Sequence, residues 1–381
     1  DLSPLMRQPG LDLVEMAREV RRGVNTLAKT VRHDQTPAYY DAMLGDFRFN
    51  EAAAETPAPD VEEQEVASLS PVPEAPTRAD QPAAPLAGRA LIVTAGEKDS
   101  LRLWDAQKAS LIAELAGAKF RPTAVRILDG GRRIALATDD HSVTLFDIPA
   151  FRQSGSFDAG FRVTSMAQAK DGALLLGGED GSLALVDGST FAVRWKGRPH
   201  RGLVSPIIVN EDGEAVITAS ADGTIAGTEL RTGRQFRRID ALPGKSPTDF
   251  AFLSPSVIAV VYEDGTIAQV SGKDGRVLTS FKGHDGWISS VEVLGDGEYL
   301  TAGVVGTLSF WTVGSERPTR IVRAHSDVAS GAKLMRFGGA SHMISAGFDG
   351  TLRIWDTQVR KLEAEMPHGA AILFFDYLPQ G

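Results

Sequence analysis

The stretch MISAGFDGTLRIWD, residues 343–356, decides the fold of this chain. It places two short apolar runs on either side of Asp349-Gly350, and an Asp-Gly pair between such runs signals a tight hairpin turn. Similar units recur upstream, where the position equivalent to Trp355 falls at 104, 146, 186, 228, 270 and 311, spacings of 40 to 44 residues. Seven units at this period predict hairpins that stack and cover one another's apolar faces.

These units resemble the repeats of the WD-repeat β-propellers, which have four strands and a Trp-Asp pair that closes the third strand. Three of the seven units keep the Trp, at 104, 311 and 355. The resemblance implies an all-β fold, a seven-bladed WD-repeat propeller over residues 89–381. A surplus apolar run at 371–377 matches inner strands elsewhere, so we expect it to pair beside residues 90–95 and to close the propeller.

In WD repeats a His, a Ser or Thr, an Asp and the Trp indole can form one hydrogen-bonded chain of buried polar groups. One unit carries the complete set: His325, Ser345, Asp349 and Trp355. A Ser-His-Asp hydrolase is the alternative interpretation, but no Gly-x-Ser-x-Gly elbow is present and the repeat gives these residues a structural role. No His pair at i, i+4 and no calcium-type acidic loop occurs, so we expect no metal and no cofactor.

Propellers of this family usually bind proteins or peptides through loops at one rim. The rim positions just before inner strands predict these partner contacts: Arg121, Phe161, Arg201, Trp287 and Asp327. Trp287 is the strongest candidate for a hot spot, because it is an aromatic anchor in a loop. The alternative is that Trp287 packs between blades. We also expect no cluster of charged residues on the channel-facing strands, which argues against an enzyme site in the central channel.

Residues 51–88 differ from the repeats in composition. They hold seven prolines and eight acidic residues against Arg78 alone. Such a segment buries too little apolar surface to offset its ordering entropy, so we expect a disordered linker; an ordered strap along the propeller is the alternative. The whole chain of 381 residues has a formal charge of −9 and no apolar run long enough to span a membrane. Neither nucleic acid nor a membrane is therefore an expected partner.

The first fifty residues predict one helix and one strand. Asp12 and Glu15 form a capping-box-like pair, and an apolar stripe at helical spacing runs from Leu13 to Val31. Residues 44–49, LGDFRF, read as a short strand with alternating Phe side chains. Fifty residues with one helix and one strand make no independent core, so the stripe must be buried on something else.

The segments 9–13, 19–24, 35–37 and 44–49 resemble, in this order, the C-terminal end of the caspase-like peptidase domain of bacterial metacaspase- and orthocaspase-type proteins. The resemblance implies a late surface helix and an edge strand of an α/β sandwich. The catalytic His and Cys of that family lie upstream of the matched segment. The chain contains no Cys, and His33 lies outside the matching motifs, so no catalytic residue is assigned to this chain.

These observations predict a caspase-like fragment at 1–50, a linker at 51–88 and a propeller at 89–381. The favoured function is a cytoplasmic interaction and regulatory propeller attached to a caspase-like cysteine endopeptidase. Its catalytic His and Cys lie outside this chain, and its partners are that upstream catalytic portion and a protein or peptide on the propeller rim. The alternative is a non-enzymatic scaffold whose N-terminal helix docks on a separate partner.

Overall fold

The computed structural model describes residues 86–378 except 87, 98–99, 116–120, 149–150, 211, 241, 296 and 358–360. The chain divides into two units, Asp1–Pro59 and Asp60–Gly381, and all described residues belong to the second. The helix expected at 12–31, the strand expected at 44–49 and nearly all of the expected linker lie outside the described residues.

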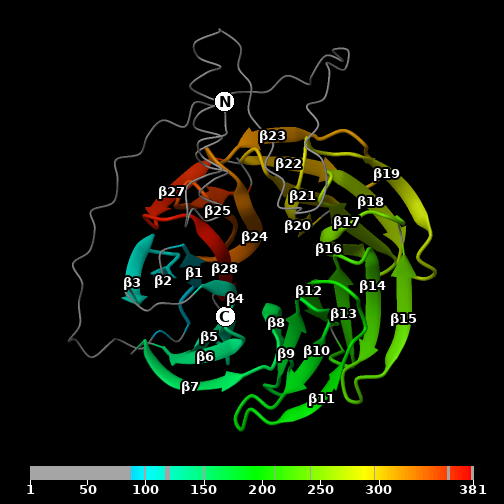
Figure 1. The fold of residues 1–381 in the computed structure, drawn as a ribbon. Helices are drawn as coiled ribbons and strands as arrows, with labels where there is room; N and C mark the ends of the chain where they lie inside the picture. The colour runs from blue at the N-terminus through cyan, green and yellow to red at the C-terminus, as the bar shows by residue number, and fades with distance from the viewer. Residues whose placement is uncertain are drawn as a thin grey trace, which may run out of the picture. The chain divides into compact units, whose positions relative to one another are not determined.

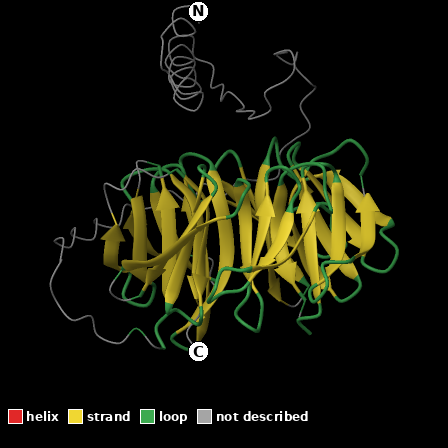
Figure 2. Cartoon of the chain, turned by 60° about the horizontal axis from the view of Figure 1, so that its bottom comes forward, coloured by secondary structure: helices red, strands yellow, loops and turns green. Residues whose placement is uncertain are grey.

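The described residues contain 28 strands and no helix, arranged as seven four-stranded antiparallel sheets. The sheets stand as blades around a central axis, with one strand of each at the centre and one at the circumference (Figure 1). Seen from the side, the strands of neighbouring blades run along the axis and loops form both rims (Figure 2). The predicted seven-bladed all-β propeller is therefore confirmed.

We number the blades along the chain and give the inner strand of each blade first. Blades 1 to 3 consist of β28 (Ile372–Leu378), β1 (Leu91–Gly96), β2 (Ser100–Asp105), β3 (Ser110–Leu115); β4 (Pro122–Leu128), β5 (Arg133–Thr138), β6 (Ser142–Asp147), β7 (Arg152–Asp158); and β8 (Val163–Gln168), β9 (Leu174–Gly178), β10 (Leu183–Val186), β11 (Val193–Gly197). Blades 4 and 5 consist of β12 (Val204–Val209), β13 (Ala215–Ser220), β14 (Thr224–Glu229), β15 (Gln235–Asp240); and β16 (Pro247–Ser254), β17 (Val257–Tyr262), β18 (Thr266–Ser271), β19 (Val277–Lys282). Blades 6 and 7 consist of β20 (Ile288–Gly295), β21 (Glu298–Gly303), β22 (Thr307–Thr312), β23 (Arg320–Arg323); and β24 (Ala329–Phe337), β25 (Ala340–Gly347), β26 (Thr351–Asp356), β27 (Leu362–Pro367).

The turn between the second and third strands of blade 6 needs glycine for two reasons. In blade 6 the Asp of the Asp-Gly pair is Val305, yet Gly306 is kept and has a φ of +79°. A Cβ on Gly306 would also lie 2.1 Å from the carbonyl oxygen of His325 in the next loop. Positive φ and close backbone approach therefore both require this glycine, whatever residue precedes it.

Blade 1 is built from both ends of the described chain. Its inner strand β28 pairs antiparallel with β1, with Leu91 opposite Leu378 and Val93 opposite Asp376. The register shifts between Ala95 and Gly96. In Figure 1 the red β28 lies beside β1 and next to β4, which closes the ring without an exposed inner edge.

The apolar core is divided among the blade interfaces. Each of seven buried clusters joins two neighbouring blades. Between blades 6 and 7, for example, Leu300 and Phe310 pack with Met343 and Trp355. A single blade cannot bury both of its faces, so the apolar surface of each blade is removed from water only when the ring is complete.

Candidate functional site

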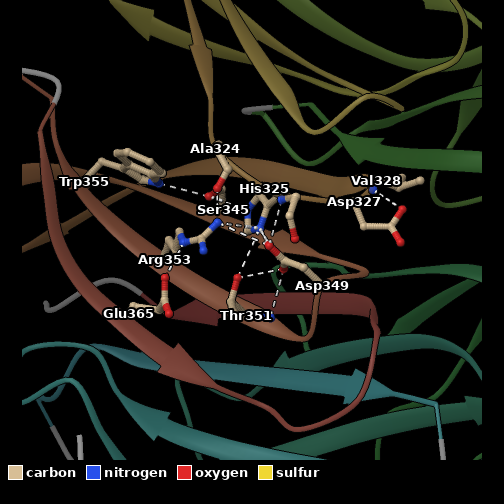
Figure 3. A network of polar contacts seen from close by, with 11 residues as sticks. Ala324, His325, Asp327, Val328, Ser345, Asp349, Thr351, Arg353, Trp355 and Glu365 are labelled. Atoms are coloured by element: carbon tan, nitrogen blue, oxygen red, sulfur yellow. Dashed lines mark hydrogen bonds and ion pairs between the residues drawn. The ribbon is translucent and has the colours of Figure 1, made fainter. Parts of the chain in front are cut away.

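The predicted network of blade 7 lies in the turn before β24, on β25 and β26 and in the turn between these two strands (Figure 3). The Trp355 indole donates to the Ser345 hydroxyl oxygen at 2.9 Å, and the Ser345 hydroxyl lies 2.8 Å from Nε2 of His325. Nδ1 of His325 is 3.0 Å from the carboxylate of Asp349. Because the carboxylate can only accept, the ring proton lies on Nδ1 and the Ser345 hydroxyl donates to Nε2. The structure thus brings all four residues together in one chain of hydrogen bonds.

This chain has the members of a hydrolytic triad but lacks the access that a nucleophile needs. Ser345 is 0% exposed and His325 is 1% exposed. The Ser345 oxygen also receives the indole N–H, so its hydroxyl is held between two fixed partners. No substrate carbonyl can approach it in this structure. The arrangement satisfies buried polar groups and holds β24, β25 and β26 in register.

Three other blades carry partial versions of this network. In blade 6, Trp311 donates to Thr301 at 2.9 Å and Thr301 lies 2.6 Å from Nε2 of His284. In blade 4, His200 contacts Thr218 at 2.8 Å and Thr224 at 3.0 Å, with no indole because residue 228 is Thr. In blade 1, Trp104 donates to Thr94 at 2.8 Å, whereas both ring nitrogens of the buried His368 have no hydrogen-bond partner.

Burial sets the charge of these histidines. It lowers the pKa of His284 to about 4, and burial together with the nearby Arg102 guanidinium lowers the pKa of His368 to about 3. Burial also lowers the pKa of His325, although the Asp349 carboxylate opposes that shift. For Asp349, burial raises the pKa but is outweighed by its hydrogen bonds, first the one from His325, so the pKa falls below its usual range. At neutral pH these histidines are uncharged and Asp349 is ionised.

The five predicted partner contacts lie before the inner strands β4, β8, β12, β20 and β24, spread around the ring. The side chain of Arg121 is 81% exposed, and Arg201 is also exposed. Trp287 and Asp327 are half-buried, and the indole nitrogen of Trp287 has no hydrogen-bond partner. Phe161 is only 5% exposed and packs in the core between blades 2 and 3, with the Lys196 ammonium 4.5 Å from its ring centre.

The expectation that the inner strands carry no cluster of charged residues is wrong. Four consecutive blades place charged side chains at the same position of the inner strand, with alternating sign: Glu292 in blade 6, Lys333 in blade 7, Asp376 in blade 1 and Arg126 in blade 2. Lys333 is 3.3 Å from Glu292, and Arg126 is 2.8 Å from Asp376. Because charges of alternating sign occur at one position of the repeat, this cluster could have been predicted from the sequence.

These acids also bind the backbone of the next blade. Asp376 accepts the Ile127 N–H at 2.8 Å, and Glu292 accepts the Leu334 N–H at 3.1 Å. Asp249 accepts the Val291 N–H at 2.9 Å in the same way. Because inner strands of adjacent blades do not pair with each other, these side chains supply hydrogen bonds that the sheets leave unmade. The charged side chains of the inner strands thus form a belt that links neighbouring blades, which we call the inner belt. The described residues contain no group of three or more His, Asp or Glu that could hold a metal ion.

The chain folds as a seven-bladed β-propeller with loops at both rims, an architecture suited to protein interaction. The profile of the family described as "WD domain, G-beta repeat" matches residues 275–312 and 316–356. Among the described residues, no helix is long and apolar enough to cross a membrane.

Several known proteins are similar to this chain at low identity. The chain is 27% identical over 171 residues to "Periodic tryptophan protein 2 homolog" of Caenorhabditis elegans, covering 43% of this chain and 18% of that protein. It is 23% identical over 313 residues to "Angio-associated migratory cell protein" of Homo sapiens, covering 75% of this chain and 69% of that protein. The chain thus spans less than a fifth of the worm protein. A crystal structure of the computationally designed Ika8 protein shares the fold, with a TM-score of 0.58, 19% identity, and coverage of 74% of this chain and 86% of that one.

Proposed function

We propose that this chain is the protein-interaction and regulatory propeller of a caspase-like cysteine endopeptidase whose catalytic His and Cys lie outside the chain. The observation that carries the proposal is the ordered series of caspase-like segments 9–13, 19–24, 35–37 and 44–49 ahead of a WD-repeat propeller. The absence of Cys from the chain requires the nucleophile to come from elsewhere. In this proposal residues 1–50 end the peptidase domain, 51–88 form the linker and 89–381 form the propeller of a cytoplasmic protein.

The coding sequence upstream of Asp1 tests this proposal directly. We expect it to encode a His and a Cys in caspase-like context. The polypeptide translated from the extended frame should hydrolyse peptide substrates and lose that activity when the Cys is replaced by Ala. This chain alone should hydrolyse none. An extended frame without such a pair would contradict the peptidase proposal, and turnover by the purified chain alone would reveal a catalytic site within this chain.

On the propeller, the proposed partner contacts are the four rim residues whose side chains are not buried in the core, Arg121, Arg201, Trp287 and Asp327, with Trp287 as the anchor. Its unpaired indole nitrogen and half-buried ring fit a residue that completes its contacts against a partner. Proteins cross-linked to the full-length chain should be lost with Trp287→Ala and kept with Phe252→Ala, a matched truncation of a partly exposed aromatic side chain on β16. If Trp287→Ala instead destabilises the propeller, and equal concentrations of folded variant and folded wild type bind the same partners, Trp287 is a packing residue.

The non-enzymatic scaffold is the second candidate, and the apolar stripe of residues 13–31 supports it as well as the peptidase proposal. If all six large apolar side chains of the stripe are buried, they represent roughly 10 kcal/mol of transfer free energy, at about 1.5 to 3 kcal/mol each. In the peptidase proposal this face packs on the catalytic domain, whereas in a scaffold it docks on a separate protein. In both, Val20→Asp should release the segment and leave the thermal transition of the propeller unchanged, which differential scanning calorimetry can measure.

A further inference from the structure

Position 228 is where one blade departs most from the repeat. In three blades the third strand places an indole against the preceding blade, and Trp104, Trp311 and Trp355 are there 4%, 1% and 3% exposed. Thr228 lies at the same position of β14, opposite Val216, as Trp355 lies opposite Met343. Blade 4 therefore presents a short polar side chain to blade 3 where three other blades present an indole.

A cleft of about 110 Å³ lies at this place between blades 3 and 4. Leu183, Trp195, Arg198 and Pro199 of blade 3 and its following loop line one wall, and Thr228 and Gln235 of blade 4 line the other. The Trp195 indole donates to the carbonyl oxygen of Leu230 at 2.7 Å, which holds the ring as a fixed wall. The volume is well below that of a small-molecule pocket and fits one large side chain.

The cleft contains a polar group without a partner. Thr228 is only 2% exposed, and its hydroxyl makes no hydrogen bond. A buried hydroxyl left unpaired is costly, and the other positions 146, 186 and 270 avoid the cost with apolar side chains. A ligand side chain with both an aromatic ring and a polar end would fill the space and pair this hydroxyl.

The outer walls on either side of the cleft are basic. Residues 193–201 contain four Lys or Arg and no acid, and residues 231–238 contain four Arg and no acid. Some of these charges are neutralised, since Arg194 pairs with Asp171 and Asp187, and Arg238 pairs with Asp222 at 3.2 Å. Arg231 and Arg234 are 85% and 74% exposed and share a single carboxylate, Glu229, at 4.0 and 3.6 Å. The cleft thus lies in a positive surface on a propeller whose residues 89–381 are close to neutral overall.

We propose that the cleft between blades 3 and 4 binds an acidic segment of a partner protein, with one aromatic side chain of that segment, a tyrosine, inserted beside Thr228. This proposal rests on the proposed interaction function and gives it a second site, on the wall of the propeller rather than on the rim. The blade 3 and blade 4 strands that form it, β10, β11, β14 and β15, are neighbours in Figure 1. The tyrosine ring supplies the missing apolar contact and the acidic flanks meet the arginines.

The probe is a fluorescein-labelled peptide with one central Tyr and four Glu on each side, titrated with the full chain and followed by fluorescence anisotropy. We expect saturable binding that weakens as NaCl is raised from 50 to 300 mM, because the charged walls are exposed. Replacing the Tyr by Ala should weaken binding by about tenfold, the loss expected for a buried aromatic anchor. Replacing every Glu by Lys should abolish binding.

Two variants address the two parts of the site. Thr228→Trp introduces the indole that three other repeats have at this position and fills the cleft. It should weaken the affinity for the Tyr peptide by at least about tenfold and leave the affinity for the Ala peptide unchanged. Arg231→Glu with Arg234→Glu should weaken both peptides. The matched control is Arg152→Glu with Arg323→Glu, which makes the same change of net charge at exposed positions outside both proposed sites. Circular dichroism and thermal unfolding identify folded variants, and the charge-reversal pair supplies the test if Thr228→Trp does not fold.

The outcomes separate this site from the rim. Binding lost in the control pair and kept in the cleft variants would overturn the cleft proposal and leave the rim function standing. No saturable binding by the wild-type chain, or equal affinity for the Tyr and Ala peptides, would also overturn it. A third variant converts the eight acids of residues 51–80 to amides. If the peptide binds only to that variant, the occupant is the chain's own acidic segment, and the partner named here is wrong.

Discussion

Acid should destabilise the propeller through its buried histidines, and His284 provides the sharpest measure. His284 is 7% exposed, and burial lowers its pKa from 6.5 to about 4. In the unfolded chain the imidazole takes up a proton near pH 6.5, whereas in the folded chain it stays neutral until about pH 4. The unfolded state therefore binds more protons between these values, and the free energy of unfolding falls as the pH is lowered through this window.

The magnitude follows from the width of the window. One proton of difference changes the free energy of unfolding by about 1.4 kcal/mol for each pH unit. His284 alone should therefore remove about 2 kcal/mol between pH 6.5 and pH 5, and about 3 kcal/mol by pH 4. Below the folded pKa this contribution is constant, and above pH 6.5 it is absent.

Urea unfolding of the wild type and of His284→Gln, at pH 7 and at pH 5, isolates this contribution. Gln can keep a hydrogen bond to Thr301 but has no proton to gain. Because His200, His325 and His368 are also buried with lowered pKa values, both proteins should lose stability at pH 5. The wild type should lose about 2 kcal/mol more than the variant, a difference in which the cost of the substitution at pH 7 cancels. An equal loss in both proteins, with coincident fluorescence and circular dichroism transitions, would show that His284 takes up no proton on unfolding in this pH range.

The remaining predictions concern the networks and the ring closure. Val305→Asp should rebuild the missing acid of blade 6, raise the pKa of His284 and stabilise the fold by about 1 kcal/mol at pH 7, measured as a higher urea midpoint; a lower midpoint would contradict this. Asp376→Ala should lower the free energy of unfolding by about 2 kcal/mol, because the Ile127 N–H loses its acceptor. Asp376→Asn keeps an acceptor and should cost less than half of that, because Arg126 is partly exposed and its ion pair with Asp376 is screened. Equal urea midpoints for these two variants would show that the charge, not the acceptor, matters. Removing residues 372–381 should abolish cooperative unfolding in calorimetry, because it deletes β28 and exposes the edge of β1; an unchanged transition would show that the ring does not need this strand.

The fold could be predicted from the repeat because each unit contains its own local sequence signals. The Asp-Gly turn and the two apolar runs around it define a hairpin within some fifteen residues, and the period of 40 to 44 residues counts the blades. The same periodicity placed His325, Ser345, Asp349 and Trp355 in one network, since residues at equivalent phases of a repeat occupy equivalent sites. It also identified the run at 371–377 as surplus, and β28 now lies beside β1.

The candidate sites depended on contacts between blades, which no single unit contains. The register of the inner strands brings Arg126 to Asp376, residues 250 positions apart, and Lys333 to Glu292. Whether Phe161 faces a partner or the core was decided by the packing of blade 2 against blade 3, where its ring is buried. Sequence patterns report which residues alternate along a strand but not which neighbour covers each face.

The fold class, the number of blades, the closing strand and the members of the blade 7 network follow from the sequence alone, because all of these are properties of one repeated hairpin. The ion pairs and backbone hydrogen bonds of the inner belt, the unpaired nitrogens of His368 and the cleft beside Thr228 emerge only when the blades pack together. A substitution within a repeat changes the space and the hydrogen bonds between two blades, and its effect depends on the side chains that the neighbouring blade presents.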